Sequence, residues 1–79
     1  MKDKAIEYVE NARKNEQKIE RRYSNGLDYI FIYEADGWIS IFDVTGGIYT
    51  PKIQAKDIEH AESYITFIEP LPPFVNVIE

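Results

Sequence analysis

The sequence predicts an α+β domain in which an N-terminal amphipathic helix packs on a small antiparallel sheet. The first 23 residues contain no Gly or Pro and repeat apolar side chains at helical spacing. From Leu27 onward, aromatic and β-branched residues follow one another with the alternation typical of strands. Asp36-Gly37 lies between two such runs and is a strong hairpin signal. At this length, we expect residues 1–79 to form a single domain.

The first predicted element is an amphipathic helix over residues 1–23. Its apolar stripe comprises Ala5, Val9, Ala12, Ile19 and Tyr23. Glu16 interrupts this stripe at a position where an apolar residue should stand. Cations gather toward the end of the segment, where the helix dipole favours them. We expect Asn25 or Gly26 to end the helix in the left-handed conformation.

A three-stranded β-meander is predicted over residues 27–53. Its strands are expected at residues 27–35, 38–44 and 48–53. A two-residue turn at Asp36-Gly37 sets the register and places Phe31 opposite Phe42. Gly46-Gly47 provides the second turn. Pro51 has no N–H to donate, and it therefore makes the third strand an edge of the sheet.

This register leaves both faces of the hairpin apolar. One face is expected to carry Tyr29, Phe31, Tyr33, Trp38, Phe42, Val44 and Tyr49, and the other Ile30, Ile32, Ile39 and Ile41. A single helix covers only one face of a sheet. The second face must therefore be covered by the C-terminal segment, by a second copy of the chain in a homodimer, or by a partner.

Two interpretations of residues 57–69 are open. Asp57 is a suitable N-cap, and residues 57–62 have the pattern of a short helix. Residues 64–69 either continue that helix, with apolar residues at 58, 61, 65 and 68, or form a fourth strand, which we favour. Both interpretations bury Ile58, Ile65 and Ile68. After the Pro-rich segment 70–73, residues 74–79 form either a last strand or a tail laid across the sheet.

Composition argues against several classes of function. The net charge of −5 disfavours bulk attraction to nucleic acid, and the absence of Cys removes disulfides, thiol nucleophiles and thiolate metal sites. No segment resembles a signal peptide or a membrane span, so we expect a cytoplasmic protein without membrane association. The sequence contains neither metal-ligand spacing nor a phosphate-binding loop, and we expect no metal and no cofactor.

His60 is the one side chain that suggests catalysis, because its unperturbed pKa lies near neutrality. Asp57 lies three residues earlier and could orient it on a helix, with Ser24, Ser40 or Ser63 as the nucleophile. Ser, Asp and His occur together by chance in most proteins. We therefore interpret His60 as a surface or packing residue and expect no enzymatic activity.

Charge is distributed unevenly along the chain. Residues 1–23 carry seven cations and five anions, whereas residues 24–79 carry two cations and nine anions. An acidic surface favours solubility, and it also suits docking on a basic surface such as one that normally holds nucleic acid. The residues expected to contact such a partner are Asp28, Tyr33, Glu34, Asp36, Trp38, Asp43 and Tyr49.

The function predicted from size, acidity and missing chemistry is that of a small acidic, non-enzymatic protein-binding module that inhibits or modulates a larger protein. Phages and mobile elements encode inhibitors of this type against host defence or nucleic-acid-processing machinery. Anti-CRISPR proteins and nucleic-acid mimics are examples. The alternative is a homodimeric nucleic-acid-associated regulator that uses the basic segment Arg13–Arg22. Glu16 and Glu20 weaken that patch, so direct nucleic-acid binding is disfavoured.

Overall fold

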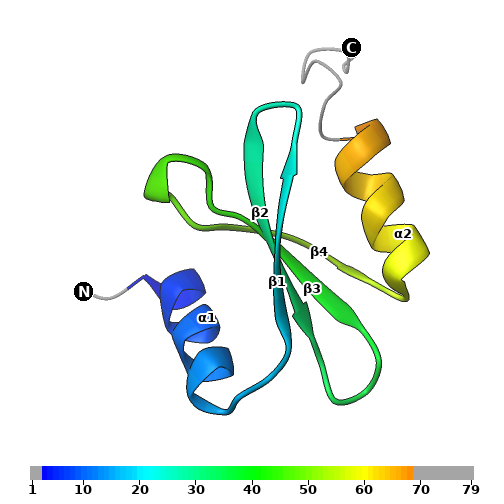
Figure 1. Ribbon diagram of the computed structural model, residues 1–79. Helices are drawn as coiled ribbons and strands as arrows, with labels where there is room; N and C mark the ends of the chain where they lie inside the picture. The colour runs from blue at the N-terminus through cyan, green and yellow to red at the C-terminus, as the bar shows by residue number, and fades with distance from the viewer. Residues whose placement is uncertain (1–2, 69–79) are drawn as a thin grey trace.

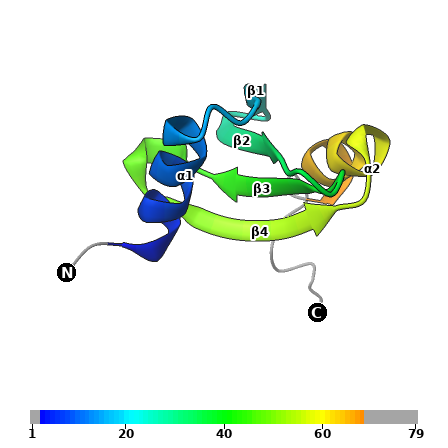
Figure 2. The ribbon, with the colours of Figure 1, turned by 90° about the horizontal axis from the view of Figure 1, so that it is seen from below.

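The computed structural model describes residues 3–68 and confirms the α+β class (Figure 1). The sheet is antiparallel and has the order β1-β2-β3-β4. Its strands are β1 (Ile19–Ser24), β2 (Leu27–Tyr33), β3 (Ile39–Asp43) and β4 (Thr50–Ala55). Helix α1 (Lys4–Lys14) precedes the sheet, and helix α2 (Ile58–Ser63) follows it and runs into a π-helical turn, Tyr64–Ile68. Figure 2 shows the two helices near opposite ends of the strands.

Helix α1 is shorter than the predicted helix over residues 1–23, which is wrong beyond Lys14. Asp3 caps its start by accepting a hydrogen bond from the Ala5 N–H at 2.7 Å. At its end, Glu16 has a φ of 58°, its N–H donates to Arg13 O, and Gln17 N–H donates to Ala12 O. These two bonds form a Schellman motif, which reverses the chain. The break in the apolar stripe at Glu16 therefore marks the end of the helix.

Residues 19–24 form strand β1 and supply the fourth strand that had been expected at residues 64–69. Asn25 and Gly26 have φ values of 53° and 79°, and Ser24 pairs with Leu27. Two consecutive left-handed residues between paired strands are the backbone of a type I′ hairpin turn. The predicted left-handed conformation is confirmed, but it closes a hairpin and does not end a helix.

The hairpin between β2 and β3 has a three-residue loop, not the predicted two-residue turn. Glu34 N–H donates to Trp38 O at 2.8 Å, and Gly37 has a φ of 95°. Phe31 therefore pairs with Ile41, not with Phe42. A slip of one residue moves every side chain of a strand to the other face. The predicted assignment of residues 39–44 to the two faces is accordingly wrong.

Each face of the sheet is covered by a helix of the same chain. The α1 face packs Ile30, Ile32, Phe42 and Val44 against Ala5, Val9 and Ala12 of α1. The α2 face packs Tyr29, Phe31, Ile39, Ile41 and Ala55 against Ala61, Tyr64 and Ile65. Burial of these side chains is the main stabilising contribution to the fold. The second face is thus covered by the segment that follows the sheet, one of the three expected solutions.

Strand β4 is an edge strand, as Pro51 predicted. A 3₁₀ turn at Thr45–Gly47 leads from β3 toward it, in agreement with the predicted turn. The pairing of β3 with β4 shifts by one residue between Ser40 and Phe42, and Pro51 lies opposite Phe42 after the shift. An irregular pairing and a residue without an N–H both discourage further strand addition at this edge.

The C-terminal helical segment settles the choice that the sequence left open. Asp57 is the N-cap, and its carboxylate accepts from the His60 N–H at 2.8 Å. Residues 64–68 continue the helix, so the favoured fourth strand at residues 64–69 is wrong. Ile65 is buried as expected, whereas Ile58 is 39% exposed. The predictions for residues 70–79 lie outside the described residues.

Candidate functional site

The carboxylate of Glu34 collects hydrogen bonds from three separate parts of the fold. The Tyr8 hydroxyl on α1 and the Ser40 hydroxyl on β3 each donate to Oε2 at 2.6 Å. Gln17 Nε2, in the loop after α1, donates to Oε1 at 3.1 Å and to the Tyr33 carbonyl at 3.2 Å. Glu34 thus fixes α1 and its following loop to the end of β2.

A polar side chain on the apolar α1 face extends this cluster across the sheet. Ser40 is only 5% exposed, and its Oγ also accepts from Gln54 Nε2 on β4 at 3.1 Å. The Ser40 hydroxyl therefore has both a donor and an acceptor, as a buried hydroxyl requires. The bonds from Gln54 to Ser40 and from Ser40 to Glu34 connect three neighbouring strand ends.

The hydrogen bonds determine the charge of the cluster. Burial acts to raise the pKa of Glu34, but the hydrogen bonds from Ser40, Tyr8 and Gln17 outweigh it and hold the pKa below its usual value. The bond to Glu34, together with burial, raises the pKa of Tyr8. At neutral pH, Glu34 is therefore ionised and Tyr8 is a neutral donor. Within residues 3–68, all hydrogen-bond partners of Glu34 are uncharged.

A groove of about 270 Å³ borders the cluster on the α1 face. Its wall is mostly apolar and aromatic, and its lining includes Tyr8, Phe42, Pro51 and Ile53 together with the polar Ser40, Gln54 and Lys52. The Tyr8 and Phe42 rings are 5.6 Å apart. Trp38 follows the hairpin loop opposite Glu34, and alternation along the strand puts it on the same face as Ser40. Tyr8 and Trp38 are each 43% exposed. Glu34 is not part of the lining itself, but Tyr8 and Ser40, which both donate to it, are. We call this cavity, together with Glu34 and the neighbouring Trp38, the Glu34 groove.

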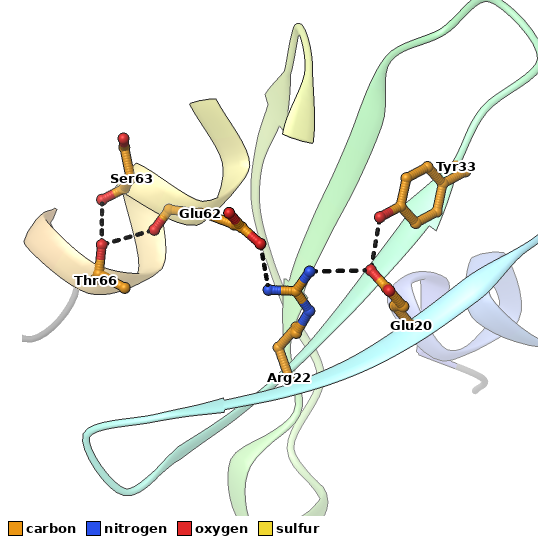
Figure 3. Close-up of polar contacts among 6 residues, drawn as sticks. All are labelled: Glu20, Arg22, Tyr33, Glu62, Ser63 and Thr66. Atoms are coloured by element: carbon orange, nitrogen blue, oxygen red, sulfur yellow. Dashed lines mark hydrogen bonds and ion pairs between the residues drawn. The ribbon is translucent and has the colours of Figure 1, made fainter. Parts of the chain in front are cut away.

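A second polar cluster lies on the α2 face and uses a different chemistry (Figure 3). The Arg22 guanidinium contacts Glu62 on α2 at 2.9 Å and Glu20 at 3.3 Å, and it lies 5.0 Å from the centre of the Phe31 ring. The Tyr33 hydroxyl donates to Glu20 at 2.6 Å. Burial and the bond to Glu20 raise the pKa of Tyr33 to about 12. This Arg22 cluster links β1 to α2.

The seven residues expected to contact a partner do not form one surface. Asp28 makes a bidentate ion pair with Arg21 at 2.9 and 2.7 Å, and Asp43 accepts from the N–H and hydroxyl of Thr45. Tyr49 is half-buried against the core of the α1 face. These three lie toward one end of the β2–β3 hairpin. Tyr33, Glu34, Asp36 and Trp38 lie at the other end, about 20 Å away at the rise of a strand.

The structure adds Tyr8, Gln17, Ser40 and Gln54 to the candidate site, none of which the sequence had identified as a partner of Glu34. The one local signal was Ser40, a polar residue in the apolar run of β3. A buried polar residue needs a hydrogen-bond partner, and that partner is Glu34. The other three come from distant parts of the chain.

Two features of the alternative functions are not supported. The basic segment Arg13–Arg22 is divided between the end of α1, a loop and β1, and Arg21 and Arg22 are ion-paired. His60 Nδ1 accepts from the Lys56 N–H at 3.3 Å, and the Asp57 carboxylate caps the backbone of α2. Neither the predicted basic helix nor an Asp–His relay is formed.

Residues 3–68 contain no group of three or more His, Cys, Asp or Glu side chains placed to hold a metal ion. In the same part of the chain, no helix has the length and apolar character needed to cross a bilayer. A scan against models of protein families, a search of curated proteins and a search of solved structures each gave no match.

Proposed function

We propose that the protein is a non-enzymatic protein-binding module that inhibits or modulates a larger protein and contacts it through the Glu34 groove. The observation that carries the proposal is an exposed aromatic residue, Tyr8, that lines a mostly apolar cavity and donates to the ionised Glu34, whose backbone pairs with a second exposed aromatic residue, Trp38. Aromatic residues around an apolar cavity with a few polar groups are typical of binding sites.

The partner surface is proposed to be basic. Asp36 is exposed in the hairpin loop next to Trp38. Ile39 pairs with Ala55, so the start of α2, with Asp57 and Glu59 exposed, lies at this same end of the sheet. Carboxylates around an aromatic contact favour a partner of opposite charge and accelerate its association.

An affinity experiment with matched variants tests the proposal. The tagged full-length chain is incubated with a lysate of the source or host cells, and Trp38→Ala is compared with Tyr23→Ala. Tyr23 is 73% exposed and follows Arg22 on β1, at the end away from the groove, and serves as the matched control. We expect a protein retained by the wild type and by Tyr23→Ala, lost with Trp38→Ala, and released by high salt. Retention that does not depend on Trp38 contradicts the proposal.

The proposed target class is host defence or nucleic-acid-processing machinery, because such proteins carry basic channels for phosphate backbones. Mass spectrometry of the retained protein and competition with duplex DNA or RNA test this part. We expect nucleic acid to displace the module from its partner. Retention unaffected by nucleic acid contradicts this target class and leaves the binding function standing.

A further inference from the structure

We propose that the Glu34 groove is a recognition site for a single cationic side chain, lysine or arginine, that the partner inserts against Glu34 and the rings of Tyr8 and Trp38. The inference rests on the proposed function in one respect, because it assumes that the cation belongs to a partner protein. It adds the chemistry of the contact, which the affinity experiment does not address.

The first argument is the charge of Glu34. Three other carboxylates of the sheet and of α2, namely Asp28, Glu20 and Glu62, contact an arginine of this chain. Glu34 differs from these three, because within residues 3–68 its partners are two hydroxyls and one amide. Asp43 also accepts from neutral donors, but it lies at the other end of the hairpin. Its negative charge is therefore stabilised but not neutralised by a neighbouring cation.

The second argument is acceptor capacity. An ionised carboxylate offers about four acceptor positions, two on each oxygen. Tyr8 and Ser40 use the two positions of Oε2, whereas Gln17 uses one position of Oε1. Oε1 can therefore accept one more hydrogen bond, which a guanidinium or an ammonium group can donate.

The third argument is the pair of aromatic rings. The chain already places cations over rings elsewhere, with Lys18 over Tyr33 at 4.6 Å and Arg22 over Phe31 at 5.0 Å. Within residues 3–68, no cation lies over Tyr8 or Trp38, and both are 43% exposed. A cation that enters beside Glu34 would gain the carboxylate and the neighbouring ring of Tyr8, with Trp38 paired to Glu34 on the adjacent strand end.

Lys52 also lines the groove and provides a second test, with an expected effect opposite to that of Glu34. Its ammonium group carries a charge of the same sign as the proposed cationic side chain. Removing this charge is expected to favour entry of the cation, whereas removing the charge of Glu34 is expected to oppose it. A purely apolar groove would respond to neither change.

A peptide titration of the full-length chain tests the inference. Trp38 is the only Trp of the sequence, so its fluorescence reports on the surroundings of this residue, next to Glu34. The probes are the blocked pentapeptides Gly-Gly-Arg-Gly-Gly and Gly-Gly-Lys-Gly-Gly, and the first peptide with citrulline, a neutral isostere, in place of Arg. We expect saturable changes with the Arg and Lys peptides and binding of the citrulline peptide weaker by about tenfold, equivalent to about 1.4 kcal/mol.

The variants Glu34→Gln and Lys52→Gln complete the experiment. Glu34→Gln is expected to remove the preference for Arg over citrulline, and Lys52→Gln to strengthen Arg binding by about threefold, the effect of a weak surface interaction. Equal binding of Arg and citrulline peptides to the wild type overturns the inference.

Glu34→Gln also weakens structural hydrogen bonds, so its loss of binding could reflect a change in folding. A second variant, Trp38→Leu, tests the site without changing these bonds. For Trp38→Leu, the amide NMR shifts of Tyr8 and Ser40 replace fluorescence as the readout, and we expect weaker Arg binding. Undiminished binding contradicts the aromatic part of the inference. The two proposals fail separately: partner capture that requires Trp38 without Arg preference leaves the function standing, whereas Arg preference without partner capture leaves only the cation site.

Discussion

The two polar clusters of this small sheet hold their carboxylates with different kinds of hydrogen-bond donor. On the α2 face, the carboxylates of Glu20 and Glu62 are held by the Arg22 guanidinium. At the α1 face, the carboxylate of Glu34 is held by the hydroxyls of Tyr8 and Ser40 and by the amide of Gln17. In the first cluster, each carboxylate contacts a cation of the same chain, and the contact ties two elements together. The second keeps its charge beside a groove, and this difference is why we assign binding to the Glu34 side.

The largest effects are expected from the apolar layers beneath the clusters, where Phe31→Ala and Ile30→Ala compare the two faces. These neighbours on β2 are fully buried on opposite faces. We expect losses of about 4 kcal/mol for Phe31→Ala and about 3 kcal/mol for Ile30→Ala, from lost burial and the cavities left behind. Such losses are a large part of the total stability of a domain. Urea denaturation measures both.

The same experiment asks whether the two faces unfold together. Far-UV circular dichroism follows both helices, whereas Trp38 fluorescence follows the end of the sheet at which Trp38 pairs with Glu34. Coincident transitions are expected in both variants, because the two layers share every strand. Separate transitions would show that the faces are independent units.

A smaller effect is expected from Arg22→Met, which removes the cation of the α2-face cluster and retains much of its apolar stem. Glu20 and Glu62 then lose their shared partner, and we expect a loss of about 1–2 kcal/mol. Arg21→Met is the matched control, because Arg21 pairs with Asp28 at an exposed site, and we expect a clearly smaller loss. Thermal melts at low and high salt measure both, and equal losses would contradict the assignment of Arg22 as the link to α2.

The Glu34 cluster is expected to respond to acid. The pKa of Glu34 in the fold lies below its usual value of 4.5, so its stabilising contribution is complete above that pH and is lost as the pH falls through the folded pKa. Glu34→Gln should therefore cost about 1 kcal/mol at pH 7 and much less at pH 3. Denaturation at both pH values measures this difference. Glu59→Gln, on the exposed side of α2, is the control. A loss of stability in Glu34→Gln that is the same at both pH values would contradict a cluster built on an ionised Glu34.

Local signals in the sequence predicted those parts of the fold that local chemistry decides. Asp57 caps a helix because its carboxylate reaches a backbone N–H three residues away. Pro51 lies on an edge strand because it has no N–H. Asn25-Gly26 gave the right backbone conformation, but left-handed residues end helices and close hairpins equally well. The choice depended on whether residues 19–24 found a strand to pair with, which no local pattern states.

The candidate site was predicted only in part, for a related reason. Residue type identified Glu34 and Trp38 as candidates, but the partners of Glu34 are 26 and 17 residues away in Tyr8 and Gln17. Their approach depends on how α1 docks on the sheet. The two-residue turn predicted from the sequence would pair Ser40 with Tyr33, whereas the three-residue loop pairs it with Ile32, on the face where it reaches Glu34. A register error of one residue therefore hides a polar cluster entirely.

The smallest effect is expected at Glu16, in the connection that joins α1 of the Glu34 cluster to β1 of the Arg22 cluster. With a φ of 58°, Glu16 occupies the left-handed position that Gly adopts without steric cost. Glu16→Gly should therefore raise the free energy of unfolding by about 0.5 kcal/mol. A helix that continued through residues 15–18 would instead lose about 1 kcal/mol on the same change, as we expect for the control Glu10→Gly inside α1. The two structures predict opposite signs for the change in the free energy of unfolding, so urea denaturation of Glu16→Gly decides whether the chain reverses at this residue. The reversal matters because it lets the segment from α1 to β1 bring Tyr8 to Glu34 and Arg22 to Glu62.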